Sequence, residues 1–87
     1  MGNGSERFQN DGRIFNRLAV LRAERGLTRQ ALAEAVGVNY QTIGFLERGD
    51  YNPSLGLAFA LSEYFAVPIE AIFSTKPFQP LMTWPTS

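Results

Sequence analysis

The sequence predicts a single all-α domain of five short helices. Three observations predict it: apolar residues recur at helical spacing, capping residues and glycines separate these stretches, and no stretch alternates as a strand does. The chain has 87 residues, which is enough for one small domain. We expect a flexible leader at residues 1–12, the helical domain at 13–75 and a proline-rich apolar tail at 76–87.

The first predicted helix begins at Arg13 and ends before Gly26. Ile14, Leu18 and Leu21 recur along it at helical spacing, so that they share one buried face. A glycine directly after a helix is a common C-terminal signal, because glycine adopts positive φ without strain.

The second and third predicted helices are joined by a very short connection. Thr28 is the expected N-cap of the second helix, which Gly37 ends. Asn39 is the expected N-cap of the third helix, which runs to about Arg48. This short connection between two helices suits a helix-turn-helix unit.

The last two predicted helices follow a turn-forming stretch at residues 50–54. Ser54 is the expected N-cap of the fourth helix. Its predicted buried stripe is Leu57, Ala58, Leu61 and Phe65. Pro68 suits the first position of a short fifth helix, Pro68–Phe73.

The third predicted helix has two sides of different chemistry. On a helical wheel Ile43 and Leu46 share one side, with Thr42 at its edge. The opposite side carries Tyr40, Gln41, Gly44, Phe45 and Arg48. We expect the aliphatic pair to face the core and the opposite side to face an external partner. A helix presented in this way fits the major groove of DNA.

The net charge of zero conceals an uneven distribution. Residues 13–48 contain six arginines and three glutamates, a net charge of +3, whereas residues 49–75 contain three acidic residues and no basic one, a net charge of −3. This asymmetry indicates one face for a polyanion and another turned away from it.

Composition also excludes several classes of function. Cysteine and histidine are absent, so disulfides, thiolate zinc sites and imidazole catalysis are excluded. We expect no enzyme, no catalytic residue, no metal, no cofactor and no small-molecule ligand. The chain has neither an apolar run of about 18 residues nor a signal peptide, so we expect a cytoplasmic protein outside the membrane.

Residues 17–74 resemble the Cro/phage-repressor (XRE-type) helix-turn-helix family. The stretches that carry the resemblance are LRAERGLTRQALAEAVGVNYQTIGFLERGDYNPSL and LSEYFAVPIEAIF. The resemblance implies a lambda-repressor-like DNA-binding domain with the helix-turn-helix at helices two and three. It also implies a short, single-domain bacterial transcriptional regulator.

The family resemblance implies roles for individual residues. The implied base contacts are Asn39, Tyr40, Gln41, Gly44 and Phe45. The implied phosphate contacts are Thr28, Arg29, Gln30, Thr42, Arg48, Tyr51 and Asn52. Arg22 and Glu47 are implied to form a structural ion pair between helices one and three. Arg29 departs from the family, which commonly has glutamine at this position.

These features predict a sequence-specific transcriptional repressor that binds double-stranded DNA as a homodimer and inserts its third helix into the major groove. The alternative is a protein-interaction module, such as an antitoxin or adaptor, whose helix-turn-helix mainly binds a protein partner. Surplus apolar residues support that alternative: Phe59, Tyr64, Phe78, Leu81, Met82 and Trp84. The tail either folds back on the chain's own helices or packs across a homodimer.

Overall fold

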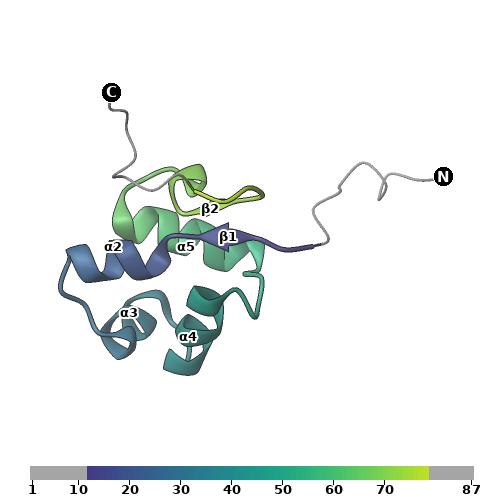
Figure 1. Ribbon diagram of the computed structural model, residues 1–87. Helices are drawn as coiled ribbons and strands as arrows, with labels where there is room; N and C mark the ends of the chain where they lie inside the picture. The colour runs from purple at the N-terminus through teal and green to yellow at the C-terminus, as the bar shows by residue number, and fades with distance from the viewer. Residues whose placement is uncertain (1–11, 79–87) are drawn as a thin grey trace.

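The computed structural model describes residues 12–78, and within them four α-helices, a 3-10 turn and two short strands enclose one core (Figure 1). In chain order the elements are β1 (Phe15–Asn16), α2 (Leu18–Glu24), α3 (Arg29–Val36), α4 (Tyr40–Arg48), α5 (Leu55–Phe65), η1 (Ile69–Ala71) and β2 (Phe73–Ser74). In Figure 1, α3 and α4 lie together below α2, α5 and the strands.

Every helix contributes large side chains to the core. The fully buried ones are Leu18, Leu32, Ile43, Leu46, Leu61, Phe65 and Ile72. The stripe predicted for the fourth helix is confirmed, because all four of its residues are buried in α5. Protein cores are packed as densely as crystals, so these shared contacts fix the helices relative to one another.

Three predicted helix starts are confirmed by side-chain caps. The side-chain oxygens of Thr28, Asn39 and Ser54 each accept a hydrogen bond from a backbone N–H in the first turn of α3, α4 and α5, at 2.9 to 3.1 Å. The predicted ends are also confirmed, since Gly37 and Gly49 follow α3 and α4 with φ of 81° and 78°. Local chemistry therefore decides where these helices begin and end.

The first helix begins later than predicted, because residues 15–16 form β1 and α2 starts only at Leu18. The cause is the side chain of Asn16. Its Oδ1 accepts a hydrogen bond from the backbone N–H of Leu18 at 2.9 Å, and its Nδ2 donates to the carbonyl of Leu46 at 2.8 Å. One amide side chain thus supports the start of α2 and ties this segment to α4.

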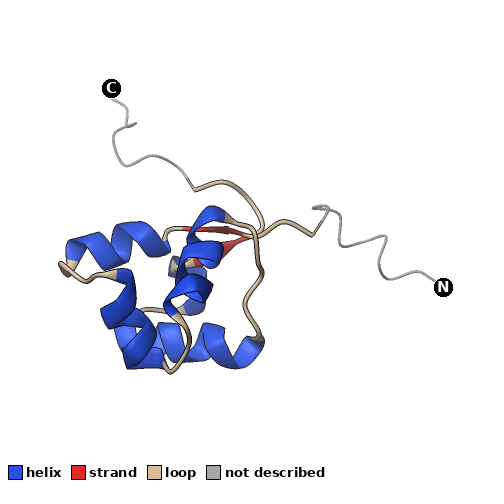
Figure 2. Cartoon of the chain, turned by 90° about the horizontal axis from the view of Figure 1, so that it is seen from below, coloured by secondary structure: helices blue, strands red, loops and turns tan. Residues whose placement is uncertain are grey.

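The predicted fifth helix, Pro68–Phe73, is wrong beyond a single turn. η1 is a 3-10 turn of three residues, after which the chain enters β2. β2 pairs antiparallel with β1, as the red strands of Figure 2 show. The register is Phe15 opposite Ser74 and Asn16 opposite Phe73. The prediction of an all-α, five-helix fold is corrected to four helices with a two-stranded sheet, because pairing with β1 replaces the last helix.

Most of the predicted leader and tail lies outside the described residues, including Leu81, Met82 and Trp84 of the tail. Phe78 is described, and the guanidinium carbon of Arg17 lies 4.8 Å from the centre of its ring. This distance is typical of a cation–π contact. Among the described residues, no helix is both long and apolar enough to cross a membrane.

Candidate nucleic-acid interface

The connection between α3 and α4 is a tight turn closed by backbone hydrogen bonds. The N–H groups of Gly37 and Val38 both donate to the carbonyl of Ala33, at 2.8 and 3.0 Å. Ala33 is only 2% exposed, so its small side chain lies where the two helices meet. The positive φ of Gly37 allows the chain to turn at once into α4. These features form a helix-turn-helix unit.

One side of α4 is buried and the other faces solvent. Ile43 and Leu46 are 0% and 1% exposed, whereas Tyr40 and Phe45 are 55% and 45% exposed. Gln41 is also exposed. Two aromatic side chains and an amide therefore project from a helix that its aliphatic side anchors to the core.

Gly44 lies on the outward side of α4 but is buried. A β-carbon at this position would lie 3.5 Å from Nη1 of Arg48 and 3.9 Å from Cδ of Arg29. The two arginine side chains therefore cover the glycine. The helical wheel did not predict this cover, because Arg29 comes from the neighbouring helix.

We expect Gly44→Ala to raise the free energy of unfolding by about 1 kcal/mol, because glycine in a helix interior costs that much relative to alanine. The added methyl group would make ordinary van der Waals contacts with the two arginines. Urea unfolding followed by circular dichroism measures the change. A loss of stability would mean that the covering side chains cannot accommodate the methyl group.

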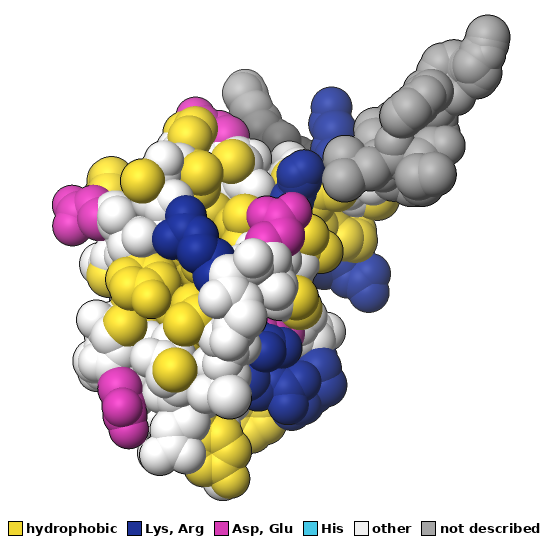
Figure 3. Space-filling model, turned by 90° about the vertical axis from the view of Figure 1, so that its left-hand side faces the viewer, with side chains coloured by type: hydrophobic (Ala, Val, Ile, Leu, Met, Phe, Trp, Pro, Cys, Tyr) yellow, Lys and Arg dark blue, Asp and Glu magenta, His cyan; other side chains and the backbone are white. Residues whose placement is uncertain are grey.

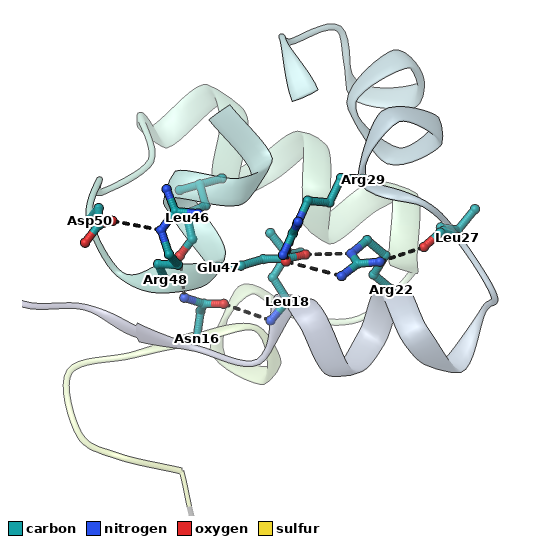
Figure 4. A network of polar contacts seen from close by, with 9 residues as sticks. All are labelled: Asn16, Leu18, Arg22, Leu27, Arg29, Leu46, Glu47, Arg48 and Asp50. Carbon is teal, nitrogen blue, oxygen red and sulfur yellow. Dashed lines mark hydrogen bonds and ion pairs between the residues drawn. The ribbon is translucent and has the colours of Figure 1, made fainter. Parts of the chain in front are cut away.

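Glu47 is the acceptor at the centre of a polar network (Figure 4). Its Oε2 lies 2.7 Å from Nε of Arg22, and its Oε1 lies 3.0 Å from Nε of Arg29. Arg22 also donates through Nη1 to the carbonyl of Leu27 at 2.9 Å. The ion pair between Arg22 and Glu47 therefore joins α2 to α4, and Arg29 adds α3 to the same carboxylate.

The Glu47 carboxylate is nearly enclosed, with a side chain that is 4% exposed. Burial by itself raises the pKa of Glu47, but hydrogen bonds from Arg22 and Arg29 outweigh it, so the pKa lies below its ordinary value. The hydrogen bond to Glu47 raises the pKa of Arg22. The network is therefore fully ionised near neutral pH.

Sequence reasoning missed the contact between Arg29 and Glu47. The resemblance placed Arg29 at a phosphate, because residues at the start of this helix contact phosphates in the family. In the structure Glu47 holds its Nε, although half of the Arg29 side chain stays exposed. The two residues lie 18 positions apart on different helices, so no local spacing predicts the contact.

A second arginine on this surface is held by an exposed acid. Nε of Arg48 lies 3.0 Å from Oδ2 of Asp50, and both side chains are more than half exposed. The Arg48 guanidinium carbon also lies 5.2 Å from the centre of the Phe45 ring. Exposed ion pairs of this kind contribute little to stability, so Arg48 can exchange Asp50 for another anion.

The other predicted contact residues differ in exposure and in hydrogen bonding. Tyr51 is 45% exposed, and Asn52 is exposed and donates to the carbonyl of Gly12 at 2.9 Å. Gln30 is exposed on α3, whereas Thr42 is half-buried at the edge of α4. The side-chain oxygens of Thr28 and Asn39 are already occupied as N-caps.

An open hollow of about 260 Å³ lies between the outer side of α4 and the start of α3. Its lining residues are Arg29, Tyr40, Gln41, Gly44, Phe45 and Arg48. It thus brings together five residues predicted from the sequence on α4 and one on α3. Two guanidinium groups, two aromatic rings and an amide converge there, which suits an anionic, planar and polar-edged ligand.

Charge is distributed unevenly over the molecular surface. In Figure 3, basic side chains cluster at the lower right of the described surface, at the height of α3 and α4. An acidic side chain is partly visible beneath that cluster, while the other acidic side chains in this view lie apart from it. This group of basic side chains therefore lies level with the helix-turn-helix, to which Arg29 and Arg48 belong, while further basic side chains are visible higher on the same face.

Comparison with known proteins shows relatives in sequence and similar solved structures. A family model described as helix-turn-helix matches residues 18–72. An uncharacterised HTH-type transcriptional regulator of Methanocaldococcus jannaschii is 48% identical over 58 residues, which cover 67% of this chain and 88% of that protein. A crystal structure from Bacteroides fragilis is similar, with a TM-score of 0.63 and 28% identity over 70% of this chain and 98% of that one. The restriction-modification controller protein C.AhdI of Aeromonas hydrophila has a TM-score of 0.58 and 30% identity, covering 62% of this chain and 82% of its own.

Proposed function

Because the chain belongs to the helix-turn-helix family of transcriptional regulators, we propose that it is a sequence-specific DNA-binding repressor. It inserts α4 into the major groove, binds as a homodimer and blocks promoter access by occupying its site. The observation that carries this proposal is the outward side of α4, where Tyr40, Gln41 and Phe45 are exposed opposite a buried aliphatic anchor.

Base reading is assigned to the outward side of α4. Gln41 carries an amide that can pair with the N6 and N7 atoms of adenine. Phe45 has no hydrogen-bonding group, so its exposed ring suits the methyl group of thymine. The hydroxyl of Tyr40 can bond to a base or a phosphate. Asn39 brings the helix start to the groove, whereas the backbone of Gly44 lies beneath the side chains of Arg29 and Arg48.

Phosphate contacts are assigned to residues on both flanks of α4. They are Thr28, Gln30, Thr42, Arg48, Tyr51 and Asn52. The N-terminus of α3 adds free backbone N–H groups, which favour an anion. Arg29 is left out of this set because its Nε is bound to Glu47. Arg22 binds the same carboxylate and belongs to the ion-pair network that joins the helices.

Dimerisation is supported by apolar side chains that the core leaves outside. Leu55 and Phe59 on α5 are 70% and 51% exposed, and they are one helical turn apart. A domain of this size reads only a few base pairs. Two copies related by a twofold axis place their recognition helices about 34 Å apart, one turn of DNA.

We expect Phe59→Ser to convert the protein from a dimer into a monomer, because the substitution removes an exposed aromatic ring from the proposed contact. Sedimentation equilibrium at micromolar concentrations measures this change. Val20→Ser is the control, since Val20 is similarly exposed (49%) but lies on α2. A wild-type protein that sediments as a monomer would refute the dimer.

We expect Gln41→Ala to relax the preference at one base position by about 1–3 kcal/mol, because the bidentate amide contact is lost. Selection from random duplex DNA followed by titration of the enriched site measures the preference. Gln30→Ala is the matched control, since it removes the same side chain from a proposed phosphate contact and should weaken all sequences alike. An unchanged preference in Gln41→Ala would exclude Gln41 as a base reader.

The same selection distinguishes DNA reading from the alternative of a protein-interaction module. A module that holds only a protein partner enriches no sequence. The exposed Phe59 and Tyr64 of α5 remain available to such a partner, but the arginines and the amide around α4 suit DNA better.

A further inference from the structure

We propose that Arg29 reads a guanine base in the major groove, from α3 and through the hollow that it shares with α4. This inference rests on the DNA-binding function proposed above. It changes the role that the resemblance implies for Arg29, from a phosphate contact to a specificity-determining residue.

The Arg29 guanidinium is held in place without being buried. Its Nε donates to Oε1 of Glu47 at 3.0 Å, while its side chain stays 50% exposed. Glu47 is in turn fixed by Arg22 at 2.7 Å and is 4% exposed, so the anchor itself is rigid. Base recognition requires a donor in a fixed position, and a pre-organised side chain loses less conformational entropy on binding.

Arg48 is held by an exposed acid instead of a buried one. It pairs with Asp50, whose side chain is 58% exposed and has no ion-pair partner besides Arg48 among the described residues. A cation whose partner is exposed can exchange that partner for a phosphate, which accepts hydrogen bonds from many directions. Arg29 and Arg48 therefore line the same hollow, but one is bound to a buried acid and the other to an exposed acid. We assign base recognition to Arg29 and phosphate binding to Arg48 for this reason.

The donors that Glu47 leaves unused on Arg29 match guanine. Within the described part of the chain, Nη1 and Nη2 of Arg29 donate to no protein acceptor. Guanine presents two acceptors, O6 and N7, in the major groove, and a guanidinium donates to both at once. Adenine presents an amino donor beside its N7, so the same fork would meet a donor there.

The position of Arg29 makes a base edge accessible to it. Its Cδ would lie 3.9 Å from a β-carbon at position 44, so it lies directly over the outward side of α4. Because residue 44 is glycine, no side chain at that position separates Arg29 from the rest of the hollow, and Arg48 is the α4 side chain that lies beside Arg29 over the glycine. Arg29 therefore opens onto the same hollow as Gln41 and Phe45, the two residues to which base reading is assigned above.

The test uses the duplex enriched by the wild-type protein and copies in which each guanine in turn is replaced by 7-deazaguanine. This replacement removes the N7 acceptor and leaves the phosphates unchanged. We expect replacement of the guanine that Arg29 contacts to weaken wild-type binding about tenfold. This loss is within the range expected when a good bidentate contact is removed. Arg29→Met keeps most of the length of the side chain but has no hydrogen-bond donor, so it should bind the two duplexes equally.

Two further variants complete the experiment. Arg48→Met is the matched control and should keep the wild-type penalty for 7-deazaguanine. Arg29→Ala replaces Arg29→Met if the methionine variant does not fold, as judged by circular dichroism. The proposal is overturned if no guanine replacement weakens wild-type binding, or if the Arg29 variants keep the full penalty. A selection that enriches no sequence would instead reject the DNA-binding function itself.

Discussion

Glu47→Gln is expected to lower the free energy of unfolding by about 3 kcal/mol, because it leaves two guanidinium groups without their shared anion. Glutamine has nearly the same volume as glutamate, so the effect isolates the charge. The Glu47 side chain is 4% exposed and that of Arg22 is 19% exposed, so water replaces the lost carboxylate poorly. Urea unfolding at neutral pH measures the change.

Asp50→Asn is the matched control for Glu47→Gln. It removes an equal charge from an ion pair of 3.0 Å, the length of the pair between Arg29 and Glu47, but both of its partners are exposed. Exposed pairs contribute about 0–1 kcal/mol, so this variant should be nearly as stable as the wild type. If the two variants lost equal free energy of unfolding, burial of the Glu47 network would make no contribution to stability.

The network also predicts how stability depends on pH. The pKa of Glu47 in the folded protein is lowered from its ordinary value of 4.5, because hydrogen bonds from Arg22 and Arg29 outweigh the effect of burial. The unfolded chain therefore binds the proton first as the pH falls. The stabilisation is complete above pH 4.5 and is lost as the pH falls through the folded pKa. The difference in stability between the wild type and Glu47→Gln should accordingly shrink in acid.

Ile43→Ala is expected to cost about 3 kcal/mol of unfolding free energy, because truncation of a fully buried isoleucine leaves a cavity. Ile43 is 0% exposed and is one of the two residues that fix α4 to the core. Thermal and urea unfolding measure the loss. At a temperature where the variant is still folded, its DNA affinity should also fall, since α4 is less firmly oriented.

Val20→Ala is the control for the truncation. Val20 is 49% exposed on α2, so losing its methyl groups should change stability by less than about 0.5 kcal/mol. If Ile43→Ala were as stable as this control, the orientation of α4 would depend on residues other than its aliphatic side.

Several features of the fold could be predicted because their causes are local. Thr28, Asn39 and Ser54 cap helices through backbone groups two or three residues away, and Gly37 and Gly49 supply the positive φ that ends α3 and α4. The orientation of α4 follows from helical periodicity alone. These contacts lie within one or two helical turns, so the sequence contains all the information they need.

Other features could not be predicted because they join distant residues. Asn16 binds the carbonyl of Leu46, 30 positions away, and a two-residue strand such as β1 has no periodicity to detect. The last segment forms β2 because β1 lies beside it, although its sequence also fits a helix. Helical preference is weak enough for tertiary pairing to override it.

The candidate interface likewise combines features that follow from the local sequence with features that depend on tertiary packing. The sequence by itself determined the helix-turn-helix, the ends of its helices and the exposure of Tyr40, Gln41 and Phe45, because spacing along one helix sets which side a residue occupies. Only the tertiary structure decided that Arg29 lies over Gly44 and shares Glu47 with Arg22. The physical reason is that a buried carboxylate attracts every guanidinium within reach, and the packing of α2, α3 and α4 determines which ones those are.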